Sequence, residues 1–206
     1  MIIRHRNQDP AVDISSFVAP TAALIGAVNV GPRSRVMYGA VLDSEGSRVE
    51  VGECTVVCEN AVLRATKTEA VEHPVRVADH VMLGPHATLL GCDVQRTAYI
   101  ATGATILQGA RIGVGAVVAV GALVHAGTVL PDGYFVPPNM IALGDPVEIR
   151  SLDDPAGLTE AVKEVGFLKI AFGLDIGWEA QSARYEHAME LRSAEFEAHR
   201  SDVLLR

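Results

Sequence analysis

Aromatic residues are scarce in this chain. Phe, Trp and Tyr make up only 5% of the 206 residues, whereas apolar residues as a whole make up 49%. The apolar content is therefore carried by Val, Ile, Leu and Ala, which favour many small, stacked β-positions over a bulky mixed core. With 20% charged residues the composition is that of an ordinary globular protein, long enough for one large domain or one domain plus an appendage.

The chain also lacks a basic excess and a long apolar run. A formal net charge of −8 argues against a nucleic-acid partner. The longest apolar stretches are too short to span a bilayer, and the charged start MIIRHRNQDP is unlike a signal peptide, so we expect no membrane partner. The odd set of Cys54, Cys58 and Cys92 favours buried free thiols in a reducing cytoplasm, although Cys54 and Cys58, four residues apart, leave a metal pair open.

Residues 100–130 repeat every six residues. They divide into IATGAT, ILQGAR, IGVGAV, VAVGAL and VHAGTV, so that aliphatic residues share one phase and glycines another. The aliphatic phase also runs upstream, and it slips by one residue before Val94. A short fixed period predicts a solenoid, in which each turn buries its apolar face against its neighbours. If three repeats make one triangular coil, Ile100 lies under Val118 and Ile106 under Val124.

Two polar stretches interrupt the period, and a different pattern follows it. Residues 43–48 (DSEGSR) and 64–76 (RATKTEAVEHPVR) are expected to bulge as loops from a β-helix domain that covers residues 1–150. Beyond it, residues 158–172 predict an amphipathic helix that Gly173 ends, and a second helix is expected at about 177–200. Residues 151–206 are therefore predicted to form a helical appendage that packs on the solenoid or on a neighbouring subunit.

Three stretches carry a family resemblance, in this order: FVAPTAALIGAVNVGPRSRVMYGAVLDSE, ADHVMLGPHATLLGC and ALGDPVEIR. They resemble the gamma-class carbonic anhydrases, which are hexapeptide-repeat proteins, over roughly residues 12–150. The resemblance implies a mainly β fold, a left-handed parallel β-helix followed by C-terminal α-helices, and a homotrimer. It also implies a zinc ion held between subunits by three histidines, where a bound water is acidified to attack carbon dioxide.

The zinc ligands of that family are replaced in this chain. The family pattern G-H-N-x-x-x-H-G-C corresponds to GPHATLLGC at 84–92, so Pro85 and Leu90 stand where two histidines would be. The remaining ligand would end the preceding strand, where this chain has Arg64. Proline and leucine offer zinc no electron pair and an arginine cation repels it. We therefore expect no metal and no other cofactor at these three positions, and no carbon dioxide hydration.

The resemblance also indicates which residues remain at the inter-subunit crevice. The family's Arg-Gly-Asp triplet corresponds to residues 43–45 (DSE), and its Gln-Asp pair to residues 58–59 (CE). The candidate pocket residues are Glu45, Glu59, Arg64 and His86, below a loop that carries Glu69, Glu72 and His73. Arg64 is expected either to pair with Glu59 or Glu45 across the trimer, or to bind a small anion or carboxylate.

These residues leave three functions open. The first is a metal-free, cytoplasmic, trimeric protein like the gamma carbonic anhydrases, which binds a small molecule or anion, serves as an assembly subunit, or has altered enzyme chemistry. The second is an acyl-CoA-dependent hexapeptide acyltransferase with a histidine as general base, for which His86 and His125 are candidates, although His125 is expected at a solvated coil position. The third, an active zinc carbonic anhydrase, is disfavoured by the residue types at 64, 85 and 90.

Overall fold

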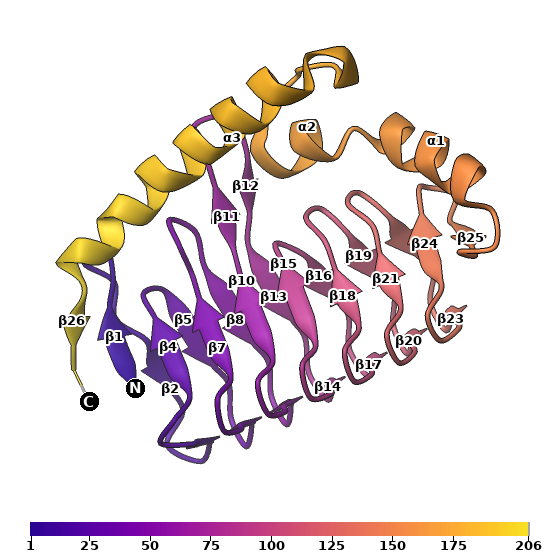
Figure 1. Ribbon diagram of the computed structural model, residues 1–206. Coiled ribbons are helices and arrows are strands. Elements are labelled where there is room, and N and C mark those ends of the chain that lie inside the picture. The colour runs from indigo at the N-terminus through magenta and orange to yellow at the C-terminus, as the bar shows by residue number, and fades with distance from the viewer. Residues whose placement is uncertain (206) are drawn as a thin grey trace.

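The chain folds into a triangular solenoid whose coils stack along one axis, with helices lying along one of its corners (Figure 1). The computed structural model describes residues 1–205. Each full coil contributes one short strand to each of three sheets, and the strands of successive coils pair in parallel. The predicted fold class, a left-handed parallel β-helix followed by C-terminal α-helices, is confirmed.

The three faces of the solenoid are named sheets 1, 2 and 3. Sheet 1 contains, in spatial order, β25 (Glu148–Arg150), β24 (Ile141–Leu143), β21 (Leu123–Val124), β18 (Thr105–Ile106), β15 (Thr88–Leu90), β10 (Val62–Arg64), β7 (Val41–Asp43), β4 (Ala23–Ile25), β1 (Ile2–Arg4) and β26 (Val203–Leu204). Sheet 2 contains β2 (Ala11–Val12), β5 (Val28–Val30), β8 (Val49–Val51), β13 (Val75–Val77), β16 (Asp93–Val94), β19 (Arg111–Ile112) and β22 (Val129–Leu130). Sheet 3 contains β23 (Phe135–Val136), β20 (Val117–Val118), β17 (Tyr99–Ile100), β14 (Met82–Leu83), β9 (Val56–Val57), β6 (Arg35–Val36) and β3 (Phe17–Val18).

The repeat in the sequence sets the register of the core. Ile100 pairs with Val118 and Ile106 with Val124, as the six-residue period predicts. One aliphatic side chain per strand points inward because successive residues of a strand face opposite sides. In sheet 1 these inward residues are fully buried and form an unbroken column: Leu24, Leu42, Leu63, Leu89, Ile106 and Val124. The core is thus a stack of small aliphatic layers, as the low aromatic content indicates.

Both predicted loops leave the solenoid at the corner between sheets 1 and 2. Residues 44–48 join β7 to β8, and residues 65–74 join β10 to β13. The second loop is not irregular throughout, since it contains the hairpin of β11 (Thr66–Lys67) and β12 (Glu72–His73). Figure 1 shows this hairpin standing out from the solenoid beside the tail helices.

The tail is more broken than its sequence period predicts. It contains α1 (Pro155–Val165), α2 (Phe167–Phe172), the 3-10 turn η1 (Trp178–Ala180), α3 (Gln181–Phe196) and the 3-10 turn η2 (Glu197–Ser201). The single helix expected at 158–172 is interrupted because Gly166 adopts a left-handed conformation, with φ of 66°. Gly173, also left-handed, ends α2 as predicted.

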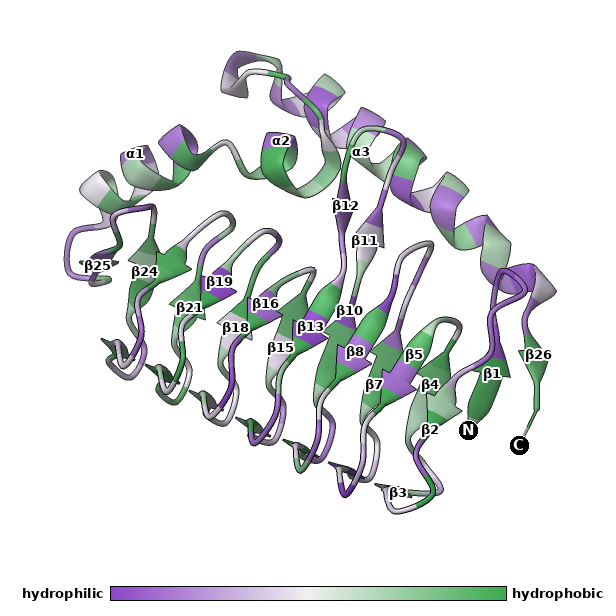
Figure 2. Ribbon diagram, turned by 180° about the vertical axis from the view of Figure 1, so that it is seen from behind, coloured by the Kyte–Doolittle hydropathy of each residue, from purple (hydrophilic) through white to green (hydrophobic). Residues whose placement is uncertain are grey.

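The tail follows the corner between sheets 1 and 2 back toward the N-terminus. Glycines make room for it: a Cβ atom at Gly127 would lie 3.1 Å from Ile170 Cδ1, and one at Gly109 would lie 3.4 Å from Ile170 Cγ2. α3 mixes hydrophobic and hydrophilic residues along its length (Figure 2), and its Ala188 is fully buried. Within the described residues, none of the helices combines the length and the hydrophobicity that crossing a membrane requires.

The chain ends by rejoining the solenoid. β26 pairs antiparallel with β1, so that Ile3 is opposite Leu204 and Arg4 opposite Val203, and the two termini lie side by side (Figure 1). The division into a β-helix domain (1–150) and a helical appendage (151–206) stays a prediction, because this last strand makes the appendage part of sheet 1.

Candidate functional site

Two of the three positions aligned with the family's zinc ligands lie together, and the third lies apart. Arg64 and Leu90 are direct neighbours in the register of sheet 1, at the ends of β10 and β15. Pro85 lies in the turn between β14 and β15, at the corner between sheets 3 and 1. Leu90 ends β15 at the corner between sheets 1 and 2, so Pro85 and Leu90 lie at opposite corners of one face. A site made from all three positions therefore needs two copies of the chain.

The residues at these positions do not fit zinc. Structural and catalytic zinc sites use thiolate, imidazole or carboxylate ligands. Pro85 and Leu90 have no donor atom in their side chains, and Arg64 carries a guanidinium that keeps its positive charge. We therefore derive no chemical step that passes through a metal at this position.

Arg64 is held by carboxylates of its own subunit. Asp43 is its neighbour in β7, and Arg64 Nε lies 3.5 Å from Asp43 Oδ2 and 3.6 Å from Glu45 Oε1. The ring of Phe196, at the end of α3, covers the guanidinium, with 5.4 Å between the guanidinium carbon and the ring centroid. The predicted pair between Arg64 and Glu45 is thus present, within one subunit instead of across the trimer.

Glu45 is a buried carboxylate whose pKa is raised. It lies in the loop between β7 and β8 and is 3% exposed, and neither of its oxygens makes a hydrogen bond. Burial, and secondly the negative charge of Asp43, raise the pKa of Glu45, while Arg192 and Arg64 act in the opposite direction. A carboxylate in this position is costly without positive partners, so the arginines near it are needed to keep it ionised.

The other two candidate residues lie at a different corner. Glu59 and His86 occupy turns between sheets 3 and 1 in neighbouring coils, where the backbone N–H of His86 donates to the carbonyl of Glu59 over 3.0 Å. His86 is exposed and has a left-handed backbone, with φ of 60°. The four candidate pocket residues therefore form two pairs at opposite corners of the face formed by sheet 1. Glu45 lies with Arg64 at one corner, and Glu59 with His86 at the other.

The loop expected above the crevice binds the tail. His73 Nε2 donates to the carbonyl of Ile170 in α2 over 2.6 Å. Glu72 accepts a hydrogen bond from Ser47 over 2.8 Å and pairs with Lys67 at 3.3 Å, whereas Glu69 is exposed at the tip of the hairpin. The hydrogen bond of His73 therefore ties the hairpin to α2.

His125 is buried, and the expectation of a solvated coil position is wrong. It is 5% exposed because Phe167, the first residue of α2, packs the edge of its ring against the imidazole, with 6.0 Å between the ring centroids. Burial lowers the pKa of His125. Sequence periodicity could not reveal this, since the residue that covers His125 comes from the tail.

The cysteines are free thiols at separate places. Cys54 is exposed in a turn, and Cys58 and Cys92 are buried. Burial, with a smaller effect of the adjacent Glu59, raises the pKa of Cys58, and burial, with a smaller effect of the adjacent Asp93, raises the pKa of Cys92. The described residues contain no group of potential metal ligands that includes Cys54 and Cys58.

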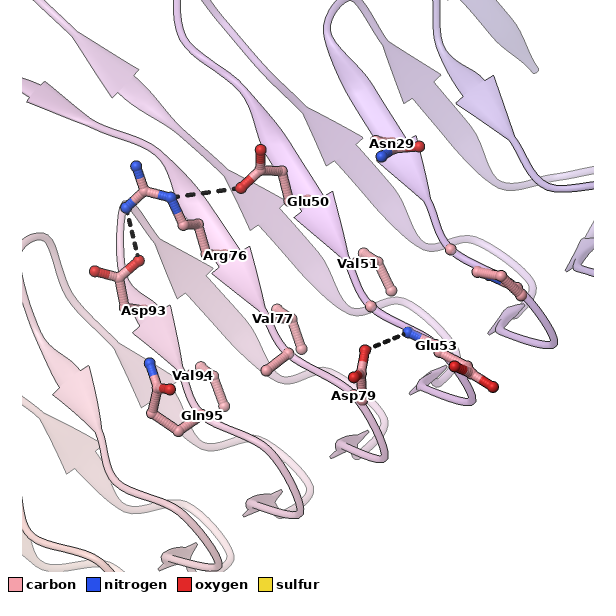
Figure 3. A pocket seen from close by; sticks show the side chains of 14 residues that line it. Asn29, Glu50, Val51, Glu53, Arg76, Val77, Asp79, Asp93, Val94 and Gln95 are labelled. Carbon is pink, nitrogen blue, oxygen red and sulfur yellow. Dashed lines mark hydrogen bonds and ion pairs between the residues drawn. The ribbon is translucent and has the colours of Figure 1, made fainter.

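The three faces of the solenoid differ in charge. On sheet 2 a row of outward side chains alternates in sign, and Arg76 lies between Glu50 at 3.4 Å and Asp93 at 3.0 Å, in a shallow hollow (Figure 3). On sheet 1 the corresponding row consists of the first residue of each strand, and it is uncharged: Ala23, Val41, Val62, Thr88, Thr105, Leu123 and Ile141. Sheet 3 carries exposed apolar residues, among them Met82, Tyr99 and Phe135.

Residues that the sequence interpretation missed surround the Glu45–Arg64 pair. Arg192 comes from α3 and His199 from η2, while His5 follows β1. None of them lies in the six-residue repeat or in a matching family motif. The signal that could have indicated them is weak: histidines in charged segments near both ends of the chain.

Sequence comparison relates half of the chain to known proteins. No family model matches it. It is 37% identical over 112 residues to gamma carbonic anhydrase 1 of Arabidopsis thaliana, a mitochondrial protein, and 41% identical over 110 residues to gamma carbonic anhydrase 3 of the same plant; each match covers 50% of this chain. Gamma carbonic anhydrase-like 2 of A. thaliana is 31% identical over 88 residues, which is 42% of this chain. The matched parts cover 41%, 43% and 34% of those relatives, so this chain spans less than half of their length.

Structural comparison gives alignments with solved structures at low sequence identity. A hexapeptide transferase family protein from Anaplasma phagocytophilum aligns with 84% of this chain and 96% of its own, at 22% identity and a TM-score of 0.48. A UDP-N-acetylglucosamine acyltransferase from Bacteroides fragilis aligns with 91% of this chain and 89% of its own, at 13% identity and a TM-score of 0.44. These likenesses concern the fold.

Proposed function

Because this chain is a homologue of the gamma carbonic anhydrases over half of its length, we propose that it is a gamma-carbonic-anhydrase-like assembly subunit without carbon dioxide hydratase activity at the family's zinc position. One observation carries the proposal: Arg64, at a ligand position, is bound to Asp43 and Glu45 of the same subunit. The position that would hold a metal ligand is thus part of an internal ion-pair network.

The same network argues against an anion or a small carboxylate at Arg64. A ligand of that charge would have to approach a guanidinium that already faces two carboxylates at 3.5 Å and 3.6 Å. The ring of Phe196 also covers one face of this guanidinium. Like charges at this distance in a partly buried place repel strongly, so we favour a structural role for Arg64 over the alternative of a bound anion.

The assembly we propose is a homotrimer with sheet 1 facing the three-fold axis. The family's zinc ion lies between subunits. In this chain the corresponding positions lie at two corners of the face formed by sheet 1, Arg64 and Leu90 at one corner and Pro85 at the other. In the proposed trimer, the subunits would meet at the face between these two corners. The row of first strand residues on this face is uncharged, in contrast to the row of alternating charges on sheet 2, whereas Asp43 and Arg64 lie in its row of last strand residues. Interface centres are depleted of charge.

Acyl transfer is the second candidate, and one observation favours it. His86 is exposed at the corner that would meet a neighbouring subunit, where an acyltransferase could place a general base. The other candidate histidine, His125, is buried below Phe167 and unavailable to a substrate. A rise in melting temperature on addition of acetyl-CoA, absent with bicarbonate, would promote this candidate above the first.

Sedimentation equilibrium tests the assembly. The protein is expected to be a trimer, and Val62→Lys, which puts a charge in the centre of sheet 1, should shift it to monomers. Val129→Lys is the matched control, because Val129 is also a half-buried, outward-facing valine but belongs to sheet 2; this variant should remain trimeric. A monomeric parent protein, or a trimer that Val62→Lys leaves intact while Val129→Lys dissociates it, would contradict the proposal.

A further inference from the structure

A cluster of potential metal ligands lies beside the Glu45–Arg64 pair and does not use any of the family's zinc positions. His5 follows β1, Glu45 lies in the loop after β7, and His199 lies in η2 near the C-terminus. One ligand atom from each of these three side chains lies within 4.8 Å of the others, and no other group of this kind occurs among residues 1–205. His5 is 1% exposed and Glu45 is 3% exposed.

Asp202 orients both histidines in the same way. Nδ1 of His5 donates to Asp202 Oδ1 over 2.6 Å, and Nδ1 of His199 donates to Asp202 Oδ2 over 2.9 Å. With the proton on Nδ1, Nε2 of His199 keeps a free electron pair on the side away from Asp202. Nε2 of His5 accepts a hydrogen bond from Arg6 Nε over 3.2 Å, which a bound metal ion would displace. The two rings are stacked, with 4.3 Å between centroids and 21° between planes. Metal-binding histidines are held by carboxylates in this way in many proteins.

Glu45 is the third potential ligand, and its two carboxylate oxygens face different partners. Its Oε2 faces His199 Nε2 at 3.8 Å, while its Oε1 faces Arg64 Nε at 3.6 Å and Arg192 Nη2 at 3.8 Å. Neither oxygen makes a hydrogen bond. Asp43 Oδ2 lies 3.9 Å from the same His199 nitrogen. Adjacent ligand atoms in a tetrahedral zinc site with bonds of about 2.0–2.1 Å are about 3.3 Å apart, so a small inward shift would bring these atoms to coordination distance.

The charged groups around the cluster have a net negative charge, which favours binding of a cation. Four carboxylates (Asp43, Glu45, Glu195 and Asp202) contact Arg64, Arg192 or the two histidines. Arg6 is the third guanidinium, and it donates to His5 Nε2 and to the backbone carbonyl of Glu195. With neutral histidines, four negative and three positive groups leave one negative charge. Buried carboxylate oxygens without hydrogen bonds are costly unless they are paired or coordinate a metal.

We infer that His5, Glu45 and His199 bind a divalent transition-metal ion of the Zn²⁺ class, with Asp43 in reach as a fourth ligand. Two imidazole nitrogens and a carboxylate oxygen are a donor set that suits zinc. The nearest rival is a metal-free clamp in which protonated histidines face the carboxylates. The inference does not depend on the proposed function, since none of residues 64, 85 and 90 is among the proposed ligands.

Such an ion would fasten the end of the chain to its beginning. His5 and His199 lie at the same end of the pairing between β1 and β26, where β1 ends and β26 begins. A surface hollow lined by Arg192, Phe196 and His199 lies on the solvent side of His199. A bound ion joins segments that are far apart in the chain and so stabilises the folded state. It would hold η2 and the end of α3 in place, where Phe196 covers Arg64.

Zinc binding by the full-length protein tests the inference. The protein is stripped with EDTA, then equilibrated with Zn²⁺ and analysed for metal by mass spectrometry and for melting temperature. We expect one zinc per chain and a rise in melting temperature. His199→Ala and Glu45→Gln should each weaken zinc binding by about tenfold or more and abolish the rise, and Asp202→Asn should weaken it by about 10- to 100-fold.

Two controls identify the position of the metal. His187→Ala removes an exposed histidine from α3, and Leu90→Ala changes a family ligand position; both variants should bind zinc as the parent protein does. Circular dichroism and sedimentation show whether each variant is folded, and the visible spectrum of bound Co²⁺ in the parent protein reports nitrogen and oxygen ligands without any mutation. Absence of zinc and cobalt from the parent protein, or equal zinc binding by folded His199→Ala and His187→Ala, would overturn the inference in favour of the metal-free clamp.

Discussion

Replacing Arg64 with methionine should destabilise the fold by about 2 kcal/mol. The change keeps an unbranched apolar stem but removes the cation that faces Asp43 and Glu45, whose side chains are both 2% exposed. Breaking a buried pair costs about 3–5 kcal/mol, and an exposed pair contributes about 0–1 kcal/mol. Arg64 itself is 38% exposed, and Arg192 also faces Glu45, so the loss should lie between these ranges, at about 2 kcal/mol.

Urea unfolding followed by circular dichroism measures this loss, at one protein concentration because assembly contributes to apparent stability. For a chain of this length the melting temperature should fall by about 4–8 °C. Arg33→Met is the matched control, because Arg33 pairs with Glu53 of the next coil at the surface, where the two side chains are 60% and 42% exposed; its cost should stay below about 0.5 kcal/mol. If Arg64→Met costs no more than Arg33→Met, Arg64 does not stabilise the buried carboxylates and the structural role assigned to it is wrong.

Three further outcomes are expected. Leu89→Ala should cost about 2–5 kcal/mol in urea unfolding, because Leu89 is fully buried in the column of sheet 1 and its truncation leaves a cavity; a cost below about 1 kcal/mol would contradict the tight stacking. Burial lowers the pKa of His125 in the folded protein. As the pH falls through about 6.5, His125 therefore binds a proton in the unfolded chain before it does so in the folded one. The free energy of unfolding should decrease below that pH, and stop decreasing below the pKa of His125 in the folded protein. His125→Gln should reduce that dependence, and an unchanged dependence would be contrary evidence. Of the three thiols, Cys54 should react with Ellman's reagent in the native protein, whereas Cys58 and Cys92 should react after unfolding.

The solenoid could be predicted because each coil repeats the same local solution. Inward positions need one aliphatic residue per strand, so the period of six is visible in the sequence and places Ile106 against Val124 without any knowledge of distant contacts. The break at Gly166 was not predictable from the hydrophobic period, since an amphipathic pattern continues through it. β26 was not predicted either, because a two-residue strand has no period and depends on the free edge of β1.

The site was predicted in part for a related reason. Motif correspondence identified Arg64, Pro85 and Leu90 as the positions aligned with the zinc ligands, and parallel pairing within sheet 1 places Arg64 and Leu90 side by side. The same correspondence could not separate Glu59 and His86 from Glu45, since it gives positions in a family and not the corner at which each residue lies. His5, Arg192 and His199 were missed because the tail brings them to Glu45 across almost the whole length of the chain.

Stopped-flow measurement of carbon dioxide hydration tests the central claim most directly, that residues 64, 85 and 90 cannot hold a catalytic zinc ion. The zinc-equilibrated parent protein and His199→Ala are compared with buffer that contains the same zinc concentration. We expect both proteins to hydrate carbon dioxide no faster than the buffer. Zinc-dependent acceleration in the parent protein would contradict the proposed loss of hydratase activity, and acceleration that persists in His199→Ala would contradict the claim that positions 64, 85 and 90 hold no zinc.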